Sequence, residues 1–239
     1  MAFVAFSRAA GPRGRRHVPA LALAAVLVSA SGAGAQSFQT IAPPKGKGPP
    51  LLVVSGQSGP SSYAHLAKTF ADKGFSVVLA DGNDLFRSGG EVPFRAAVKA
   101  AQSAPSALPG PVGVVGFSLG GAAALTYGTR MAPDVAAVVA VYPFTAWIDD
   151  LDAFVRRVGV PTLVLAATQD SYRDCCLIAT ARALVKAGQA QRRPIRLVEY
   201  PQANHAFAIG GNSYRDAGAN DAVRRTAAHM SAAGVGRGR

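Results

Sequence analysis

Apolar and polar segments alternate along the chain and predict strands and helices in turn. Short, wholly apolar runs rich in β-branched residues are typical of strands buried on both faces of a parallel sheet. Longer segments with apolar residues at helical spacing separate these runs. The predicted strands are 51–54, 75–80, 112–115, 135–142, 162–167 and 195–200, and the predicted helices are 63–73, 93–104, 122–131, 147–157, 177–187 and 221–233. This order predicts a single α/β domain with a mainly parallel sheet and helices on both faces.

Polar residues follow four of the predicted strands. Gln57, Ser118, Asp170 and His205 each lie in a loop just after the carboxyl end of a strand. Ligand sites in open parallel sheets form beyond that edge. We therefore expect these four positions to converge on one site.

Ser118 lies in the most informative of these loops. The sequence Gly-Phe-Ser-Leu-Gly (116–120) follows an apolar strand and precedes an Ala-rich helical segment. This is the strand–turn–helix context of a nucleophile elbow. The flanking glycines let strand and helix approach each other, and the start of the helix directs free N–H groups toward an oxyanion. Ser118 is therefore the candidate nucleophile.

A serine nucleophile needs a histidine that accepts its proton. The chain has four histidines. His17 lies in the N-terminal segment, and His65 and His229 fall within predicted helices, where a surface or packing role is expected. His205 alone lies in a loop after a strand and downstream of Ser118. It is the candidate base.

The third member of such a site is a carboxylate that fixes the tautomer of the imidazole. On this architecture the carboxylate lies between the serine and the histidine in the chain. Asp170 follows the strand 162–167 closely and is the candidate acid. Asp174 is an alternative, although it is better placed to cap the helix that follows.

Two backbone N–H groups are predicted to hold the oxyanion. One belongs to Leu119, the residue after the nucleophile, and the other to Gln57 in the loop after the first strand, with Ser58 as an alternative. The same loop does not read as a phosphate cradle, because it lacks the Gly-Lys-Ser/Thr ending. The predicted chemistry requires no metal and no organic cofactor.

The N-terminal 35 residues resemble an export signal. Four arginines between positions 8 and 16 precede an apolar stretch at 18–28, and the small residues Ala33-Gly34-Ala35 precede Gln36. The apolar stretch is shorter than the roughly 20 residues of a membrane span. We expect a signal peptide at 1–35, an extended lead-in at 36–50, the hydrolase-type domain at 51–233, a frayed tail at 234–239, and a periplasmic or secreted mature protein.

The formal net charge of the chain is +12. Without the four arginines of the N-terminal 35 residues, 21 basic and 13 acidic residues remain, a net charge of +8. The basic residues are scattered and accompany no nucleic-acid motif, so we expect neither a nucleic-acid partner nor stable membrane insertion after processing.

The two cysteines, Cys175 and Cys176, are adjacent. Neighbouring Cα atoms lie about 3.8 Å apart, below the roughly 4.4–6.8 Å that a relaxed disulfide spans. We therefore expect no disulfide between them, with one sulfur buried and the other partly exposed. A redox-active or intermolecular role is the alternative.

At these motifs the chain resembles the α/β-hydrolase superfamily and, within it, the dienelactone hydrolase-like family. The resemblance covers about residues 51–230 and rests on Val-Val-Gly-Phe-Ser-Leu-Gly-Gly (114–121), on Asp170 with Cys175 shortly after it, and on Val-Glu-Tyr-Pro-Gln-Ala-Asn-His-Ala-Phe (198–207). It implies the α/β-hydrolase fold, and it implies that Ser118, Asp170 and His205 are nucleophile, acid and base. The segment 144–157 is short, so we expect little or no lid.

The chain departs from the family pattern at three places. Dienelactone hydrolases carry cysteine at the elbow, where this chain has Ser118, so lactone specificity is not carried over. The oxyanion stretch of the family often reads His-Gly, and here Ser55 precedes Gly56. The family's carboxylate-binding arginines have no clear counterpart, and Arg87 and Arg173 are interpreted as surface charges.

The function expected from these observations is hydrolysis of small or medium carboxylic esters through an acyl-enzyme on Ser118. A peptidase or acyl-peptide hydrolase on the same fold is one alternative. A non-catalytic binding protein on a hydrolase scaffold is another, and the intact set of serine, aspartate and histidine argues against it.

Overall fold

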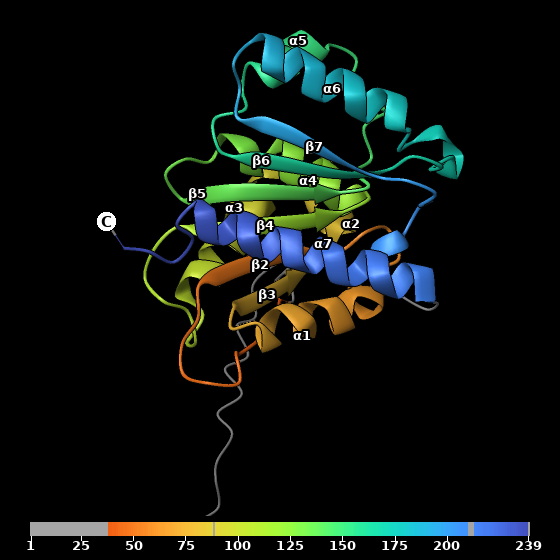
Figure 1. Cartoon of the computed structure of the whole chain (residues 1–239). Helices are drawn as coiled ribbons and strands as arrows, with labels where there is room; N and C mark the ends of the chain where they lie inside the picture. Colours follow the sequence, from red (N-terminus) through yellow and green to blue (C-terminus); the bar gives the residue numbers. More distant parts are fainter. Residues whose placement is uncertain (1–37, 88, 210–212, 239) are drawn as a thin grey trace, which may run out of the picture. The chain divides into compact units, whose positions relative to one another are not determined.

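The computed structural model describes residues 38–87, 89–209 and 213–238, and the predicted signal peptide lies outside these residues. Residues 36–239 form one compact unit. Its sheet has the strand order β1-β3-β2-β4-β5-β6-β7 (Figure 1). The strands are β1 (Gln39–Ile41), β2 (Pro50–Val54), β3 (Ser76–Ala80), β4 (Val112–Phe117), β5 (Val135–Val141), β6 (Thr162–Ala167) and β7 (Ile195–Tyr200).

All strand pairs are parallel except β1 with β3, which is antiparallel. The mainly parallel sheet predicted from the sequence is thus confirmed. The parallel direction of the strands also explains where the site lies. The carboxyl ends of β2, β4, β6 and β7 all lie at one edge, and the predicted polar residues follow those four strands.

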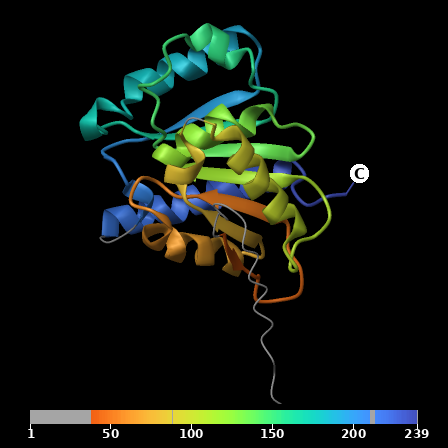
Figure 2. The same ribbon diagram turned by 180° about the vertical axis from the view of Figure 1, so that it is seen from behind.

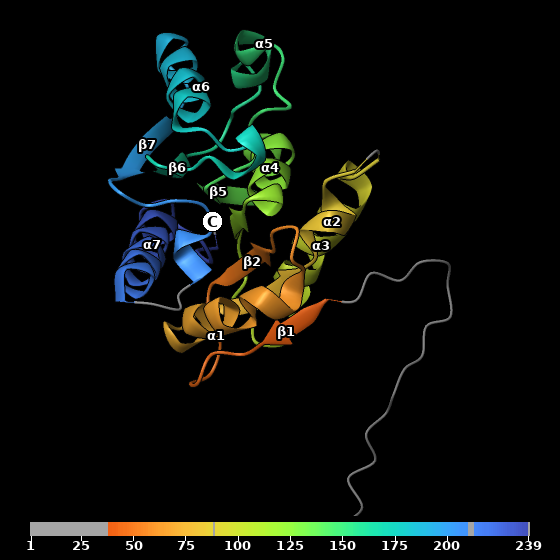
Figure 3. The same cartoon turned by 90° about the vertical axis from the view of Figure 1, so that its right-hand side faces the viewer.

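Helices cover both faces of the sheet, and Figure 3 shows the sheet almost edge-on between them. The α-helices are α1 (Ala64–Asp72), α2 (Gly82–Leu85), α3 (Glu91–Ser103), α4 (Leu119–Thr126), α5 (Leu151–Val155), α6 (Ile178–Ala190) and α7 (Ser213–Ala232), and short 3-10 helices lie at Pro60–Tyr63, Gly128–Arg130, Tyr172–Asp174 and Phe207–Ile209. α1 and α7 lie across one face (Figure 1), and α2 and α3 are seen on the other when the molecule is viewed from behind (Figure 2).

The side-chain alternation of the buried strands divides the core between these two helix layers. Leu51 and Val53 of β2 pack in a cluster with residues of α1 and α7. Leu52 and Val54 point to the opposite face and pack with residues of α3 and α4. Because successive side chains of a strand point to opposite faces, a strand between two helix layers must be apolar at every position. All five residues of β2 are buried accordingly.

Several segments differ from the sequence expectation. The helix predicted at 122–131 is α4 (Leu119–Thr126) followed by the 3-10 helix Gly128–Arg130, and the helix predicted at 147–157 is the shorter α5 (Leu151–Val155). The extended lead-in contains β1, which pairs with β3 and is the outermost strand on that side of the sheet. The last helix begins at Ser213, eight residues before the predicted start. The expected frayed tail is held on the domain over its first part, because Val235 is buried and the Gly236 N–H donates to the Pro111 carbonyl at 3.1 Å.

The connection between β5 and β6 carries one helix of five residues, α5, whose Val155 packs with residues of α6. This short connection agrees with the expected absence of a large lid. Within the described ranges, no helix combines the length and apolar character needed to cross a membrane.

Candidate active site

Ser118 occupies a sharp turn between β4 and α4. Its backbone has φ 50° and ψ −114°, outside the conformations that residues other than glycine usually adopt. The turn is held because the Ser118 N–H donates to the Val141 carbonyl at 3.0 Å and the Ser118 carbonyl accepts from the Phe144 N–H at 3.0 Å. The strained turn places the hydroxyl beyond the carboxyl end of β4, as expected for a nucleophile elbow.

Two glycines make this turn possible. A Cβ atom at Gly116 would overlap the backbone carbonyl of Gly120, and a Cβ atom at Gly120 would overlap the carbonyl oxygens of Val54 and Ser55. Strand β4, helix α4 and the end of β2 therefore approach each other more closely than any side chain allows. This packing fixes the position of Ser118 relative to the loop after β2.

His205 and Asp170 complete a continuous chain of hydrogen bonds with Ser118. The Ser118 Oγ lies 3.0 Å from the Nε2 of His205, and the Nδ1 of His205 lies 2.8 Å from the Oδ2 of Asp170. The side chain of Asp170 is fully buried and that of His205 is 16% exposed. The structure thus brings together three residues that the sequence places in three separate loops.

The partners of Asp170 determine which nitrogen of His205 carries the proton. An ionised carboxylate only accepts hydrogen bonds, so Nδ1–H donates to Oδ2 and Nε2 is left free to accept the proton of Ser118. The other carboxylate oxygen, Oδ1, accepts the backbone N–H of Tyr172 at 3.1 Å. Both oxygens of Asp170 are therefore held in place. The arrangement can transfer a proton from the serine hydroxyl to the imidazole.

Two tyrosines that the sequence analysis did not identify hold the imidazole ring of His205. The ring of Tyr172 stacks on it with a centroid distance of 4.6 Å and an interplanar angle of 11°. Tyr142 meets it edge-on at 5.0 Å and 65°. Burial raises the pKa of Tyr142 well above its usual value, so this tyrosine stays protonated beside the imidazole. No sequence signal points to Tyr172, because its position depends on the backbone of the loop that follows Asp170.

A cavity of about 350 Å³ opens at Ser118. Its lining residues are Gln57, Ser118, Leu119, Phe144, Ala146, Tyr172, Arg173 and Cys175. The two predicted oxyanion residues thus border the same cavity as Ser118. Leu119 is the first residue of α4, so its N–H has no carbonyl one turn earlier in the helix to bond.

The loop that carries Gln57 is held by hydrogen bonds with residues that follow β3. The side-chain amide of Asn83 donates both to the Gln57 carbonyl at 3.1 Å and to the carboxylate of Asp81 at 2.8 Å. Asp81 also accepts a bond from the Ser55 hydroxyl at 3.4 Å. These contacts set the orientation of the peptide at Gln57. The oxyanion role of its N–H stays a prediction.

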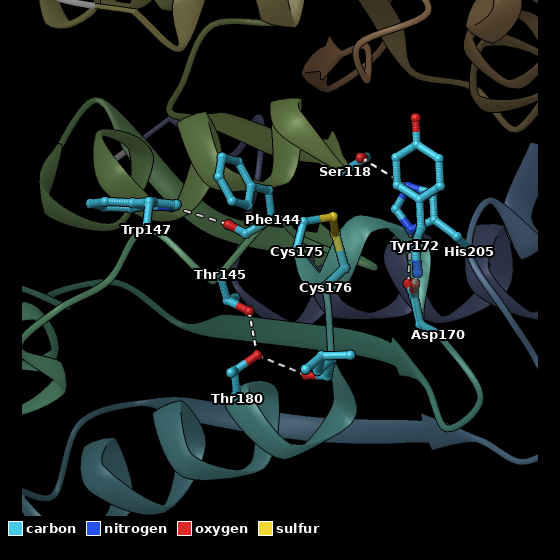
Figure 4. Close-up of a disulfide and its surroundings, with 11 residues drawn as sticks. Ser118, Phe144, Thr145, Trp147, Asp170, Tyr172, Cys175, Cys176, Thr180 and His205 are labelled. Carbon is cyan, nitrogen blue, oxygen red and sulfur yellow. Dashed lines mark hydrogen bonds and ion pairs between the residues drawn. A yellow bond between two sulfur atoms is a disulfide. The ribbon is translucent and has the colours of Figure 1, made fainter.

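Cys175 and Cys176 form a disulfide, and the expectation of two unpaired sulfurs was wrong. The expectation applied the Cα spacing of disulfides between distant residues. Here the Cα atoms are 3.8 Å apart, the spacing of neighbouring residues, and the bond closes a ring within the chain itself. Figure 4 shows the disulfide beside Tyr172 and His205, and Cys175 lines the cavity at Ser118.

The remaining candidates lie away from the reacting groups or at their margin. His65 is exposed, and Asp174, the alternative acid, is exposed as well. His229 is buried, its Nε2 lies 3.2 Å from the Pro161 carbonyl, and burial lowers its pKa.

Arg87 is exposed and pairs with Asp84. Arg173 is exposed as well, and it also lines the cavity at Ser118.

One group of possible metal ligands lies among the described residues. Single ligand atoms of Asp170, Cys176 and His205 lie within 4.8 Å of one another. A cysteine binds a metal as its thiolate, and the sulfur of Cys176 is bonded to Cys175. The other two residues are hydrogen-bonded to each other. We therefore interpret the group as part of the serine site.

Comparison with protein families gives a match over residues 84–234 to the model described as the dienelactone hydrolase family. The matched range includes the elbow, Asp170 and His205. The chain belongs to the dienelactone hydrolase family. This family consists of carboxylic ester hydrolases, and the chain is an enzyme of that class. No curated protein matches the chain.

Solved structures share the fold. A protein from Klebsiella pneumoniae described as a candidate dienelactone hydrolase is 19% identical, with a TM-score of 0.68 over 81% of this chain and 92% of the other. Est1E from Butyrivibrio proteoclasticus is 14% identical, with a TM-score of 0.63 over 81% and 94%. Esterase 2 of Thermogutta terrifontis is 16% identical, with a TM-score of 0.64 over 84% and 91%. At these identities the likeness establishes the α/β-hydrolase fold, as the sequence predicted.

Proposed function

We propose that Ser118, His205 and Asp170 are a catalytic triad that hydrolyses carboxylic esters through an acyl-enzyme intermediate. The observation that carries this proposal is the unbroken line of hydrogen bonds from the Ser118 Oγ through both nitrogens of His205 to a fully buried carboxylate. Its support is geometric, because each contact is short enough for the proton transfers that the reaction needs.

The reaction begins when the Ser118 Oγ attacks the ester carbonyl and transfers its proton to the Nε2 of His205. The negative charge of Asp170 stabilises the imidazolium that forms. The backbone N–H groups of Leu119 and Gln57 bind the oxygen of the tetrahedral intermediate. His205 then protonates the leaving alcohol, and Ser118 is left acylated.

Water completes the cycle at the same place. It occupies the position that the alcohol has left, and His205 removes its proton as it attacks the acyl carbonyl. The second tetrahedral intermediate collapses when His205 returns the proton to the Ser118 Oγ, and the carboxylic acid leaves. The residues of the chain supply every proton transfer in this sequence.

A fluorophosphonate probe tests the assignment of the nucleophile directly. We expect mass spectrometry to find the label on the peptide that contains Ser118, and the Ser118→Ala variant to bind none. In parallel, wild type and variant are compared on chromogenic esters and on peptide anilides. Equal rates for the two proteins on every substrate would remove the triad proposal, and turnover of anilides above esters would favour a peptidase.

We also propose that the protein is exported and that its mature chain begins at Gln36. The basic and apolar pattern of residues 8–35 supports this. The disulfide adds support, because such bonds persist in oxidising compartments outside the cytoplasm. Intact-mass measurement of the protein recovered from the periplasm and the medium tests it. A chain that keeps residues 1–35 and stays in the cytoplasmic fraction contradicts it.

A further inference from the structure

One wall of the cavity at Ser118 takes no part in the proton transfers or the oxyanion binding proposed above. Phe144, Ala146, Tyr172 and Cys175 line this wall, and Cys175 is one half of the disulfide. Disulfide sulfur is apolar and polarizable, as thioether sulfur is, and sulfur makes favourable contacts with aromatic rings. The wall therefore suits an apolar group, and an aromatic group best.

The disulfide is held firmly against the neighbouring loop. The carbonyl of Cys175 accepts the backbone N–H of Thr145 at 2.9 Å and that of Ala146 at 3.1 Å. Below it, the hydroxyls of Thr145 and Thr180 are 2.6 Å apart, and Thr180 also donates to the Leu177 carbonyl (Figure 4). These two backbone hydrogen bonds join the loop that carries Asp170 and the disulfide to the loop that carries Phe144. A loop whose backbone is already held by hydrogen bonds loses little conformational entropy when it binds a substrate group.

The position of His205 indicates which part of an ester meets this wall. His205 must protonate the leaving alcohol, so the alcohol lies on the His205 side of Ser118. Figure 4 shows Tyr172 and His205 on one side of the disulfide and Phe144 on the other. An acyl group directed away from His205 therefore passes over the disulfide toward Phe144.

We propose that the Cys175–Cys176 disulfide is a specificity-determining part of the acyl site, and that it favours esters of aryl-bearing acids over acetate. This inference rests on the proposed function. It assigns to the disulfide a direct contact with the substrate, in addition to its place in the loop after Asp170.

The test compares two substrates with the same leaving group, p-nitrophenyl 3-phenylpropionate and p-nitrophenyl acetate. In the Cys175→Ala/Cys176→Ala variant we expect kcat/KM for the phenylpropionate to fall about tenfold, at the lower end of what a lost apolar contact costs in a pocket. We expect kcat/KM for the acetate to fall by a smaller factor, so that the phenylpropionate-to-acetate ratio falls, because the acetyl group has no aryl ring to contact the wall. The fall should appear mainly in KM.

Thr180→Val is the matched control. It removes the hydroxyl that anchors the loop but leaves the wall of the cavity unchanged, so any effect should be equal for the two esters. Equal losses for both esters in the double alanine variant would mean that the disulfide only positions the loop, and they would overturn the inference. An unchanged ratio without loss would overturn it as well.

Reduction of the folded wild-type enzyme gives the same readout if the double variant does not fold. Dithiothreitol transfers two electrons and two protons to the disulfide and becomes its own cyclic disulfide, which leaves two thiols at Cys175 and Cys176. We expect the phenylpropionate-to-acetate ratio to fall, and the double variant, where it folds, to be insensitive to the reagent. A ratio that stays constant while alkylation shows both thiols formed refutes the inference.

These outcomes are separable from failure of the proposed function. If the wild-type enzyme hydrolyses neither ester, or does so equally well with Ser118→Ala, the triad proposal fails first. If hydrolysis depends on Ser118 and the substrate ratio does not depend on the disulfide, only the specificity inference fails.

Discussion

Replacing Asp170 by asparagine tests the central hydrogen-bond chain without changing the size of the side chain. In the native site Oδ1 accepts the Tyr172 N–H and Oδ2 accepts the His205 Nδ1–H. An asparagine has one oxygen for these two donors. If the oxygen faces Tyr172, the amide NH₂ faces Nδ1, and the proton moves to Nε2, where it blocks transfer from Ser118.

The opposite orientation of the amide keeps the productive tautomer but sets two buried donors against each other. Leaving the Tyr172 N–H unsatisfied costs about 1–3 kcal/mol, which biases the amide toward the unproductive orientation. The substitution also removes the negative charge that stabilises the imidazolium. Together these effects are expected to lower kcat about 10⁴-fold, as this substitution does in other triads, or by about 5.4 kcal/mol in the barrier.

The assay is the initial rate of p-nitrophenyl acetate hydrolysis with enzyme whose melting curve shows that it is folded. Asp174→Asn is the matched control, because Asp174 lies in the same loop, is exposed, and was the alternative acid on sequence grounds. Asparagine also tolerates the φ of 53° at this position. A kcat of Asp170→Asn within tenfold of wild type, or a loss in Asp174→Asn as large as in Asp170→Asn, refutes the assignment of the acid.

Two further predictions concern residues that support the site, and a third concerns a buried histidine away from it. Gly116→Ala forces its Cβ against the Gly120 carbonyl, so we expect the free energy of unfolding in urea to fall by about 1–3 kcal/mol together with loss of activity; full activity would contradict the packing argument. Tyr172→Ala removes the ring stacked on His205 and should lower kcat about three- to tenfold with little change in the melting temperature, whereas Tyr172→Phe should retain wild-type kcat. The pKa of His229 in the folded protein lies below its unfolded value of 6.5, so the unfolded chain takes up the proton more readily. The free energy of unfolding should therefore decrease as the pH falls below about 6.5. His229→Gln should flatten this pH dependence, and an unaltered slope excludes His229 as its source.

Ser118, Asp170 and His205 could be predicted from the sequence because each lies in a loop just after an apolar run that predicts a strand. The bounds of β6 and β7 coincide with the predicted 162–167 and 195–200. Pro161 and Pro194 precede the two strands, and Pro201 follows β7. Parallel strands bring their carboxyl ends to one edge whatever their order along the sheet. The convergence of Ser118, Asp170 and His205 could therefore be expected before their distances were known.

The features that the sequence does not predict depend on contacts between distant segments or on unusual backbone. β1 is three residues long and becomes a strand only through its pairing with β3. Tyr172 reaches His205 from a loop in which Arg173 and Asp174 both have positive φ, a conformation that residues of these types rarely adopt in succession. The disulfide was missed because a rule for distant cysteines was applied to adjacent ones.

The sheet of the described chain ends at β7 on the side away from β1, and this has a consequence for how copies of the protein behave at high concentration. An edge strand offers unpaired backbone groups to which another chain can add. In β7 the exposed positions are Arg196 and Glu199, and Glu199 is paired with Arg182 of α6. Bringing two such strands together would crowd and desolvate these charges. Surface redesign that replaces Arg196 and Glu199 by β-branched apolar residues therefore invites aggregation, even where it leaves the fold and the triad intact.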